Sequence, residues 1–95
     1  MKVIFSERAR RDLRAIAAWI SKDRPLAAQK IAVGLRVACA MLAKQPYAYQ
    51  FAEGREDKGV RRAPYSRYLV LYRAEASHIS VVRILDGARD ITNLL

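Results

Sequence analysis

Two apolar runs near the carboxyl end of the chain constrain its fold more than any other feature. Residues 68–74 and 78–85 both consist of strand-forming side chains in alternation, and only residues 75–77 separate them. A connection this short allows only antiparallel pairing. A further strand is predicted at residues 60–64, with a turn at residues 64–67, so three consecutive strands form a small antiparallel sheet.

Helical periodicity dominates the first half of the chain. Residues 1–5 form a short apolar run typical of a strand, and Ser6 supplies the N-cap of a first helix. Apolar side chains then recur at helical spacing as far as residues 22–24, where Pro25 is suited to open a second helix. That helix ends before Pro46, and the two helices are predicted to turn back on each other.

The predicted order of elements is β-α-α-β-β-β, an α+β fold. A helical hairpin packs on a small antiparallel sheet, a short C-terminal turn or helix covers residues 90–95, and one domain spans residues 1–95. Residues 47–58 lack periodicity and are predicted to form a surface loop. Gly34 costs the second helix about 1 kcal/mol relative to alanine, which predicts a close approach of the first helix there.

Arg83 is the polar exception in an otherwise apolar strand. An unpaired guanidinium is costly to bury, so three interpretations stay open: its face is open to water, it pairs with Asp86 or Asp90, or it is reserved for a partner. Alternation of side chains predicts the faces of the last two strands. These are Tyr68, Val70 and Tyr72 opposite Leu69, Leu71 and Arg73, and Ser80, Val82 and Ile84 opposite Val81, Arg83 and Leu85.

The charge of the chain narrows its possible partners. Eighteen Lys and Arg residues against nine Asp and Glu residues give a formal net charge of +9. A field this strong favours an acidic protein, nucleic acid or the ribosome, and the alternative is a basic surface that is merely solvated. Arg10, Arg11 and Arg14 gather on the first helix, with Trp19 beside its apolar stripe. An acidic, disordered tail that folds as it binds would suit this surface.

The composition excludes several other classes of protein. No apolar run approaches the roughly 20 residues of a membrane span, and no cleavable apolar leader follows Met1, so we expect a soluble cytoplasmic protein without membrane contact. Cys39 is the single cysteine and His78 the single histidine, so no metal-ligand spacing exists and no cofactor is expected. Cys39 is predicted to be a small core residue.

The residues needed to cut RNA are not evident. Cleavage at a 2′-hydroxyl needs a base, an acid and a cation, and only cations are plentiful here. His78 lies beside a turn without a partner at catalytic spacing, and we expect it to be exposed to solvent. Tyr65, Tyr68 and Tyr72 would need strong activation, because an unperturbed phenol titrates near pH ~10. No catalytic residue is therefore predicted.

The Tyr-Leu-Val-Leu-Tyr sequence at residues 68–72 and the Gly-Ala-Arg-Asp sequence at residues 87–90 resemble the ParE branch of the ParE/RelE superfamily of small bacterial toxins. The resemblance extends over essentially the whole chain. In RelE-like nucleases it would place a catalytic arginine where this chain has Leu69, and a Tyr or His within residues 91–95, which are Ile-Thr-Asn-Leu-Leu. Aliphatic side chains neither transfer protons nor bind phosphate.

The resemblance implies the toxin of a bacterial type II toxin–antitoxin pair. Such a toxin would inhibit or poison DNA gyrase, would form a hetero-oligomer with an acidic, partly disordered ParD-like antitoxin, and would not bind specific DNA sequences alone. The alternatives are a ribosome-dependent mRNA endonuclease of the RelE type and a non-toxic co-repressor that only binds antitoxin. Candidate antitoxin-binding residues are Arg10, Arg11, Arg14 and Trp19, and candidate target-binding residues are Arg61, Arg83, Arg89 and Asp90.

Overall fold

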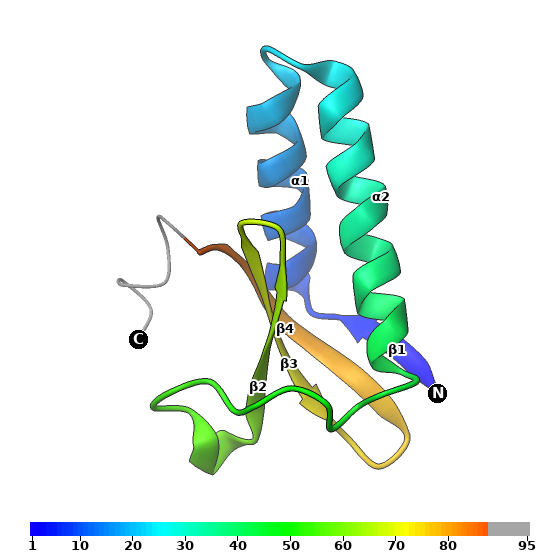
Figure 1. Ribbon diagram of the computed structural model, residues 1–95, viewed down its shortest axis with the longest axis vertical. Helices are drawn as coiled ribbons and strands as arrows, with labels where there is room; N and C mark the ends of the chain where they lie inside the picture. The colour runs from blue at the N-terminus through cyan, green and yellow to red at the C-terminus, as the bar shows by residue number, and fades with distance from the viewer. Residues whose placement is uncertain (88–95) are drawn as a thin grey trace.

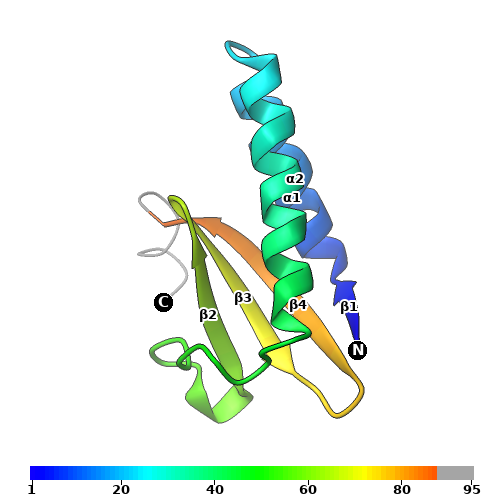
Figure 2. The same ribbon diagram turned by 45° about the vertical axis from the view of Figure 1, so that its right-hand side comes forward.

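The computed structural model describes residues 1–87 and has the predicted order of elements. Figure 1 shows two antiparallel helices beside one twisted sheet, with the closed end of the hairpin projecting beyond the strands. Figure 2 shows the same hairpin lying along one side of the sheet. The elements are β1 (Lys2–Phe5), α1 (Glu7–Ser21), α2 (Pro25–Leu42), a 3-10 helix (Glu56–Lys58), β2 (Val60–Tyr65), β3 (Tyr68–Ala74) and β4 (His78–Asp86).

The sheet has the strand order β1-β4-β3-β2. Antiparallel pairing of β2 with β3 and of β3 with β4 confirms the sequence prediction for the three consecutive strands. β1 instead pairs in parallel with β4, from Lys2 beside His78 to Phe5 beside Val81, so the sheet as a whole is mixed rather than purely antiparallel. The parallel pair is possible because the helical hairpin follows β1 in the chain and supplies the long connection that parallel strands require.

Ser6 joins the start of α1 to the sheet. Its Oγ accepts a hydrogen bond from the Ala9 amide at 3.0 Å, which confirms the predicted N-cap. The same hydroxyl donates to the carbonyl oxygen of Val82 at 2.8 Å, and the Ser6 amide donates to that of Val81 at 3.0 Å. These bonds set the position of α1 against β4. Pro25 occupies the first turn of α2, as predicted.

The main core lies between the helical hairpin and one face of the sheet. Cys39 is buried in it as predicted, and burial raises the pKa of its thiol to about 11. A smaller apolar cluster comprises Ala52, Val60, Leu69, Leu71 and Leu85. The main cluster comprises Ala9, Leu13, Leu35, Cys39, Leu42, Ala63, Tyr68, Val70, Tyr72, Ile79, Val81 and Ile84.

A β-bulge alters the predicted faces of β4. Opposite β3, the register shifts between Leu71, which faces Arg83, and Tyr72, which faces Val81. The extra residue in β4 interrupts its alternation, so Val81 and Ile84 both belong to the main core, although strict alternation placed them on opposite faces. The prediction for β3 holds, since Tyr68, Val70 and Tyr72 share the main core.

Gly34 in α2 accommodates a tyrosine from the sheet. A Cβ at this position would overlap the Tyr65 hydroxyl at the end of β2. The neighbour that requires glycine is thus Tyr65 and not the first helix, which corrects the sequence prediction. The two residues are 31 positions apart, so helical spacing gives no sign of the contact.

By length and composition alone, α2 meets the criteria for a membrane-spanning helix, which the search for a long apolar run did not detect. A helix that packs in a protein core can meet the same criteria. Leu35, Cys39 and Leu42 on one side of α2 are buried in the main core. The apolar residues of α2 therefore form two groups, one buried in the main core and one exposed on the outer face.

Candidate functional site

A groove of about 300 Å³ lies between α1 and α2. Its apolar lining is Phe5, Leu13, Ala17 and Ala32, and its polar lining is Arg10, Arg14 and Arg36, without a carboxylate. Arg10 and Arg14 lie one turn apart on α1, and α2 brings Arg36 to the same groove. The arrangement presents three positive charges around an apolar floor.

Among the described residues, few carboxylates pair with the arginines of this groove. Within residues 1–87, no salt bridge involves Arg10 or Arg36, and Arg14 lies 4.0 Å from the Glu7 carboxylate in an exposed pair. An exposed pair at this distance contributes little to stability. The three guanidinium groups are therefore available to carboxylates of a partner, and the hairpin is the candidate functional site.

An exposed apolar stripe extends this site over the outer face of α2. It consists of Leu26, Val33, Val37 and Met41, all of which are exposed. Because residues three or four positions apart are neighbours on a helix surface, Val33 lies beside Arg36 of the groove. α2 contains Lys30 and Arg36 but no Asp or Glu. The stripe with its cationic borders matches an amphipathic partner that carries acidic flanks.

The structure divides the four residues predicted to bind antitoxin. Arg10 and Arg14 share the groove, Arg11 is exposed outside its lining, and Trp19 lines a different pocket. Because Trp19 lies nine residues after Arg10, it falls on the opposite side of α1. Arg36 was not predicted, although its spacing from Ala32 on α2 was a usable signal.

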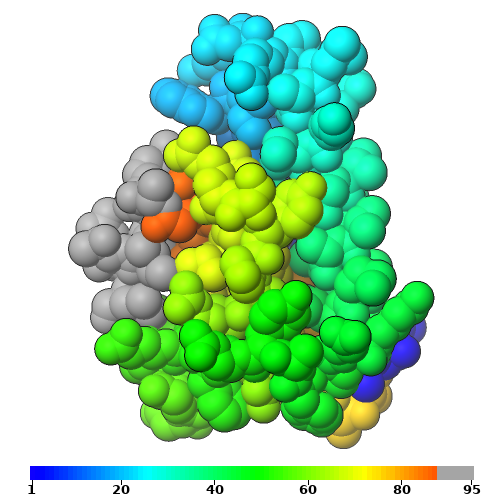
Figure 3. Space-filling model, viewed as in Figure 1, coloured from blue at the N-terminus to red at the C-terminus, as the bar shows by residue number. Residues whose placement is uncertain are grey.

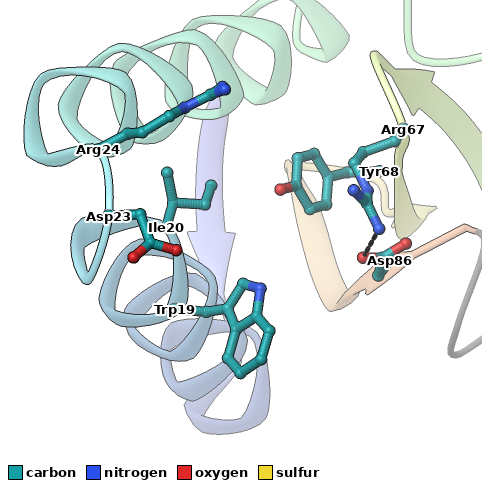
Figure 4. A pocket seen from close by; sticks show the side chains of 7 residues that line it. All are labelled: Trp19, Ile20, Asp23, Arg24, Arg67, Tyr68 and Asp86. Atoms are coloured by element: carbon teal, nitrogen blue, oxygen red, sulfur yellow. Dashed lines mark hydrogen bonds and ion pairs between the residues drawn. The ribbon is translucent and has the colours of Figure 1, made fainter.

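The pocket beside Trp19 lies between the end of α1 and the turn that joins β2 to β3 (Figure 4). Its polar wall is an ion pair in which Arg67 Nη2 lies 2.7 Å from Asp86 Oδ2. The hydrogen bond and charge of Asp86 raise the pKa of Arg67. Trp19 is 65% exposed, and the Lys22 ammonium lies 5.3 Å from its ring centroid. Unlike the hairpin groove, this pocket contains paired charges.

Arg83 forms the ion pair that the sequence left open, but with a different partner. Its Nε and Nη2 donate to the two carboxylate oxygens of Asp12 on α1, at 2.8 and 3.2 Å. Asp12 Oδ2 also accepts the Ile84 amide at 3.0 Å. The predicted partner Asp86 instead binds Arg67, and Asp90 lies outside the described residues. Asp12 is 71 positions away from Arg83, so strand alternation gave no sign of it.

Arg61 lies elsewhere on the sheet. Its guanidinium stands over the Phe51 ring at 4.1 Å and the Tyr47 ring at 5.4 Å, and its Nη1 donates to the Tyr49 carbonyl oxygen at 2.7 Å. Arg61 is on β2 and Arg83 on β4, with β3 between them. These two candidate target-binding residues therefore do not form one cationic patch, and Arg89 lies outside the described residues.

The described residues provide no evident acid–base pair for RNA cleavage. Leu69, where the resemblance would place the catalytic arginine of RelE-like nucleases, is buried in an aliphatic cluster. The Tyr72 hydroxyl donates to the Pro46 carbonyl oxygen at 2.9 Å, and burial raises its pKa. His78 is partly exposed beside Ser77 Oγ, at 3.2 Å. Residues 1–87 also contain no cluster of metal-ligating side chains.

Comparison with known proteins identifies the family. Residues 3–91 match the family model described as the ParE toxin of the type II toxin–antitoxin system parDE, so the chain belongs to this family. The chain is also similar to the protein named Toxin RelE2 of Caulobacter vibrioides, with 33% identity over 88 residues that cover 93% of this chain and 97% of that protein. Both findings confirm a type II toxin of the ParE/RelE superfamily.

A solved structure supports the same fold. It is the chromosomal ParDE TA system from P. aeruginosa, one chain of which superposes with a TM-score of 0.76. The match covers 88% of this chain and 92% of that chain, at 21% sequence identity. This chain thus shares its overall fold with a chain of that solved structure.

Proposed function

We propose that this toxin arrests growth in the cytoplasm by inhibiting or poisoning DNA gyrase, and that it acts by binding rather than as an enzyme. The observation that carries the proposal is the state of the residues a RelE-like nuclease would use. Leu69 is aliphatic and buried, and Arg83 is bound by both carboxylate oxygens of Asp12. A guanidinium held in this way is poorly placed to bind phosphate, and the carboxylate beside it, Asp12, is itself occupied by Arg83 and the Ile84 amide.

We further propose that a ParD-like antitoxin neutralises the toxin at the hairpin. The groove around Arg10, Arg14 and Arg36, with the adjoining stripe on α2, combines positive charge with exposed apolar surface. A disordered, acidic segment that folds into an amphipathic helix would neutralise the charges and cover the apolar side chains. The matched family and the solved ParDE structure are both named as parts of a two-component system, which supports an antitoxin as the partner.

One experiment separates the candidate activities. The chain is induced without antitoxin, and the purified protein is added in parallel to a gyrase supercoiling assay and to translating ribosomes. We expect loss of supercoiling or accumulation of cleaved DNA at concentrations that leave mRNA intact. Site-specific mRNA cleavage that disappears in Arg83→Ala would support the endonuclease instead, in line with the name of the RelE2 relative. Absence of both effects, with antitoxin binding retained, would indicate a co-repressor.

A second experiment tests the antitoxin surface with matched charge changes. Arg10→Glu combined with Arg36→Glu should weaken antitoxin binding by about 100-fold and reduce its salt dependence, because both charges border the groove. Arg11→Glu combined with Lys22→Glu changes the charge equally but lies outside the groove lining, and should alter affinity much less. Equal losses in the two double variants would show that only net charge matters.

A further inference from the structure

The segment that follows α2 is fastened along the outer edge of β2. The Ala52 amide donates to the Val60 carbonyl oxygen at 2.8 Å, and the Arg62 amide donates to the Gln50 carbonyl oxygen at 3.0 Å. Phe51 lies between these bonds and pairs with Arg61 as an isolated antiparallel bridge. In Figure 3 this part of the chain, in green, spreads over the lower end of the molecule. The predicted surface loop is therefore in part an additional edge of the sheet.

Buried and partly buried groups hold the start of the same segment. The Tyr72 hydroxyl donates to the Pro46 carbonyl oxygen, and the Arg61 guanidinium donates to the Tyr49 carbonyl oxygen. Tyr72 itself is fully buried in the main core. The backbone that carries Tyr47, Tyr49 and Phe51 is thus preorganised by bonds at both of its ends.

Two aromatic rings, those of Tyr47 and Phe51, lie under one cation at this edge, and the backbone carbonyl of Tyr49 between them accepts a hydrogen bond from the same cation. We name the group Tyr47, Tyr49, Phe51 and Arg61 the aromatic platform. Tyr47 is 68% exposed, and Tyr49 and Phe51 are also exposed. Arg61 stands over two of the rings and uses one N–H in its bond to the backbone, out of the five that a guanidinium carries. Exposed rings beside a cation are what single-stranded nucleic acids require for stacking and phosphate binding.

We propose that the aromatic platform binds single-stranded nucleic acid, with bases stacked on the Tyr47 and Phe51 rings and a phosphate near Arg61. The net charge of +9 attracts a polyanion to any part of the surface, and the platform adds the flat rings on which bases stack. Its exposed large side chains are all aromatic, whereas the α2 stripe that suits a protein helix is aliphatic and thioether in character. The site is additional to the hairpin groove and does not depend on gyrase being the target.

The test uses the purified full chain and three fluorescein-labelled probes: dT12, rU12 and a 12-base-pair DNA duplex. Binding is followed by fluorescence anisotropy over a series of salt concentrations. We expect dT12 and rU12 to bind more tightly than the duplex. Tyr47→Ala should weaken dT12 binding by about 10-fold, and Tyr47→Phe should stay within about twofold of the parent, because the ring is retained. Since Tyr47 is mostly exposed, its variants should unfold like the parent.

Trp19→Ala is the matched control. Trp19 is as exposed as Tyr47 and also lies under a cation, but it belongs to α1 and not to the platform. Its loss should leave dT12 affinity unchanged. Equal weakening by Trp19→Ala, full affinity in Tyr47→Ala, or full affinity in Tyr47→Leu would overturn the proposal. So would a Tyr47→Ala variant that loses gyrase inhibition while dT12 binding is unaltered, which would assign the platform to a protein partner.

Discussion

The two edges of the sheet pair their exposed backbone groups in different ways. Beyond Phe5, where β1 ends, the edge of β4 is closed by α1 through Ser6 and through the Asp12 carboxylate, which accepts the Ile84 amide. At the other side, the edge of β2 is closed by the backbone of residues 50–52. Side chains of Ser6 and Asp12 thus bind the backbone of the β4 edge, whereas another stretch of backbone binds the β2 edge.

The difference explains why two arginines predicted for the same role have different surroundings. The side chains of Arg83 and Asp12 are 19% and 13% exposed, so their ion pair is largely withdrawn from water and is part of the fold. Arg61 is held by exposed rings and one carbonyl oxygen, and its environment stays open to a ligand. A cation in a small basic toxin is therefore informative about function only once its partner is known.

The largest expected effect is at the α1 edge. Asp12→Ala leaves the Arg83 guanidinium and the Ile84 amide without their carboxylate partner, so the free energy of unfolding should fall by about 3 kcal/mol. Urea denaturation measures the change. Glu7→Ala, which removes an exposed carboxylate 4.0 Å from Arg14 in the first turn of α1, should cost only about 0.5 kcal/mol. If the two variants lost similar stability, the contrast between a structural and a solvated ion pair would be wrong.

A second prediction concerns the core between the two edges. Because burial raises the pKa of the Cys39 thiol from 9.0 to about 11, the folded state holds this proton more tightly than the unfolded state. Its contribution to stability is complete below pH 9 and is lost as the pH rises through 11, with about 2 kcal/mol lost by pH 11. Urea denaturation between pH 8 and 11 should show the decline, and Cys39→Ala should make it shallower. An unchanged slope in that variant would assign the decline to other groups, such as Tyr72, whose pKa burial also raises.

At the β2 edge the expected effects are smaller. Tyr72→Phe removes the donor to the Pro46 carbonyl oxygen and should lower the free energy of unfolding by about 1 kcal/mol. Hydrogen exchange should accelerate for the Ala48 and Ala52 amides, whose hydrogen bonds flank this anchored segment, but not for the Ile84 amide at the other edge. Acceleration at both edges would mean that the sheet opens as one unit and that its edges are not independent.

The smallest expected effect concerns the contact between Gly34 on α2 and Tyr65 at the end of β2. Gly34→Ala improves helix propensity by about 1 kcal/mol but directs a methyl group at the Tyr65 hydroxyl, so the two contributions should largely cancel. In a Tyr65→Ala background the steric conflict is gone, and the same substitution should stabilise the protein by about 1 kcal/mol. Thermal unfolding of all four variants gives the coupling energy. Zero coupling would remove Tyr65 as the reason for glycine.

The sequence by itself determined the elements of this protein. Hydrophobic periodicity, the Ser6 cap, Pro25 and the short connections between strands specify helices and strands through interactions that are local in the chain, and their predicted bounds agree closely with the structure. The resemblance at residues 68–72 and 87–90 led to the right family. It too could be recognised from sequence because it rests on contiguous residues. Composition gave the net charge of +9 but not its distribution.

Only the tertiary structure decided which side chains meet. The Asp12 partner of Arg83, the Tyr65 neighbour of Gly34 and the place of Arg36 beside Arg10 all join residues distant in sequence, and no local period records such contacts. The bulge in β4 belongs to the same class, because an extra residue is accommodated only in relation to the strand opposite. Local sequence patterns determine the helices and strands, and the packing of these elements determines which residues form the candidate sites.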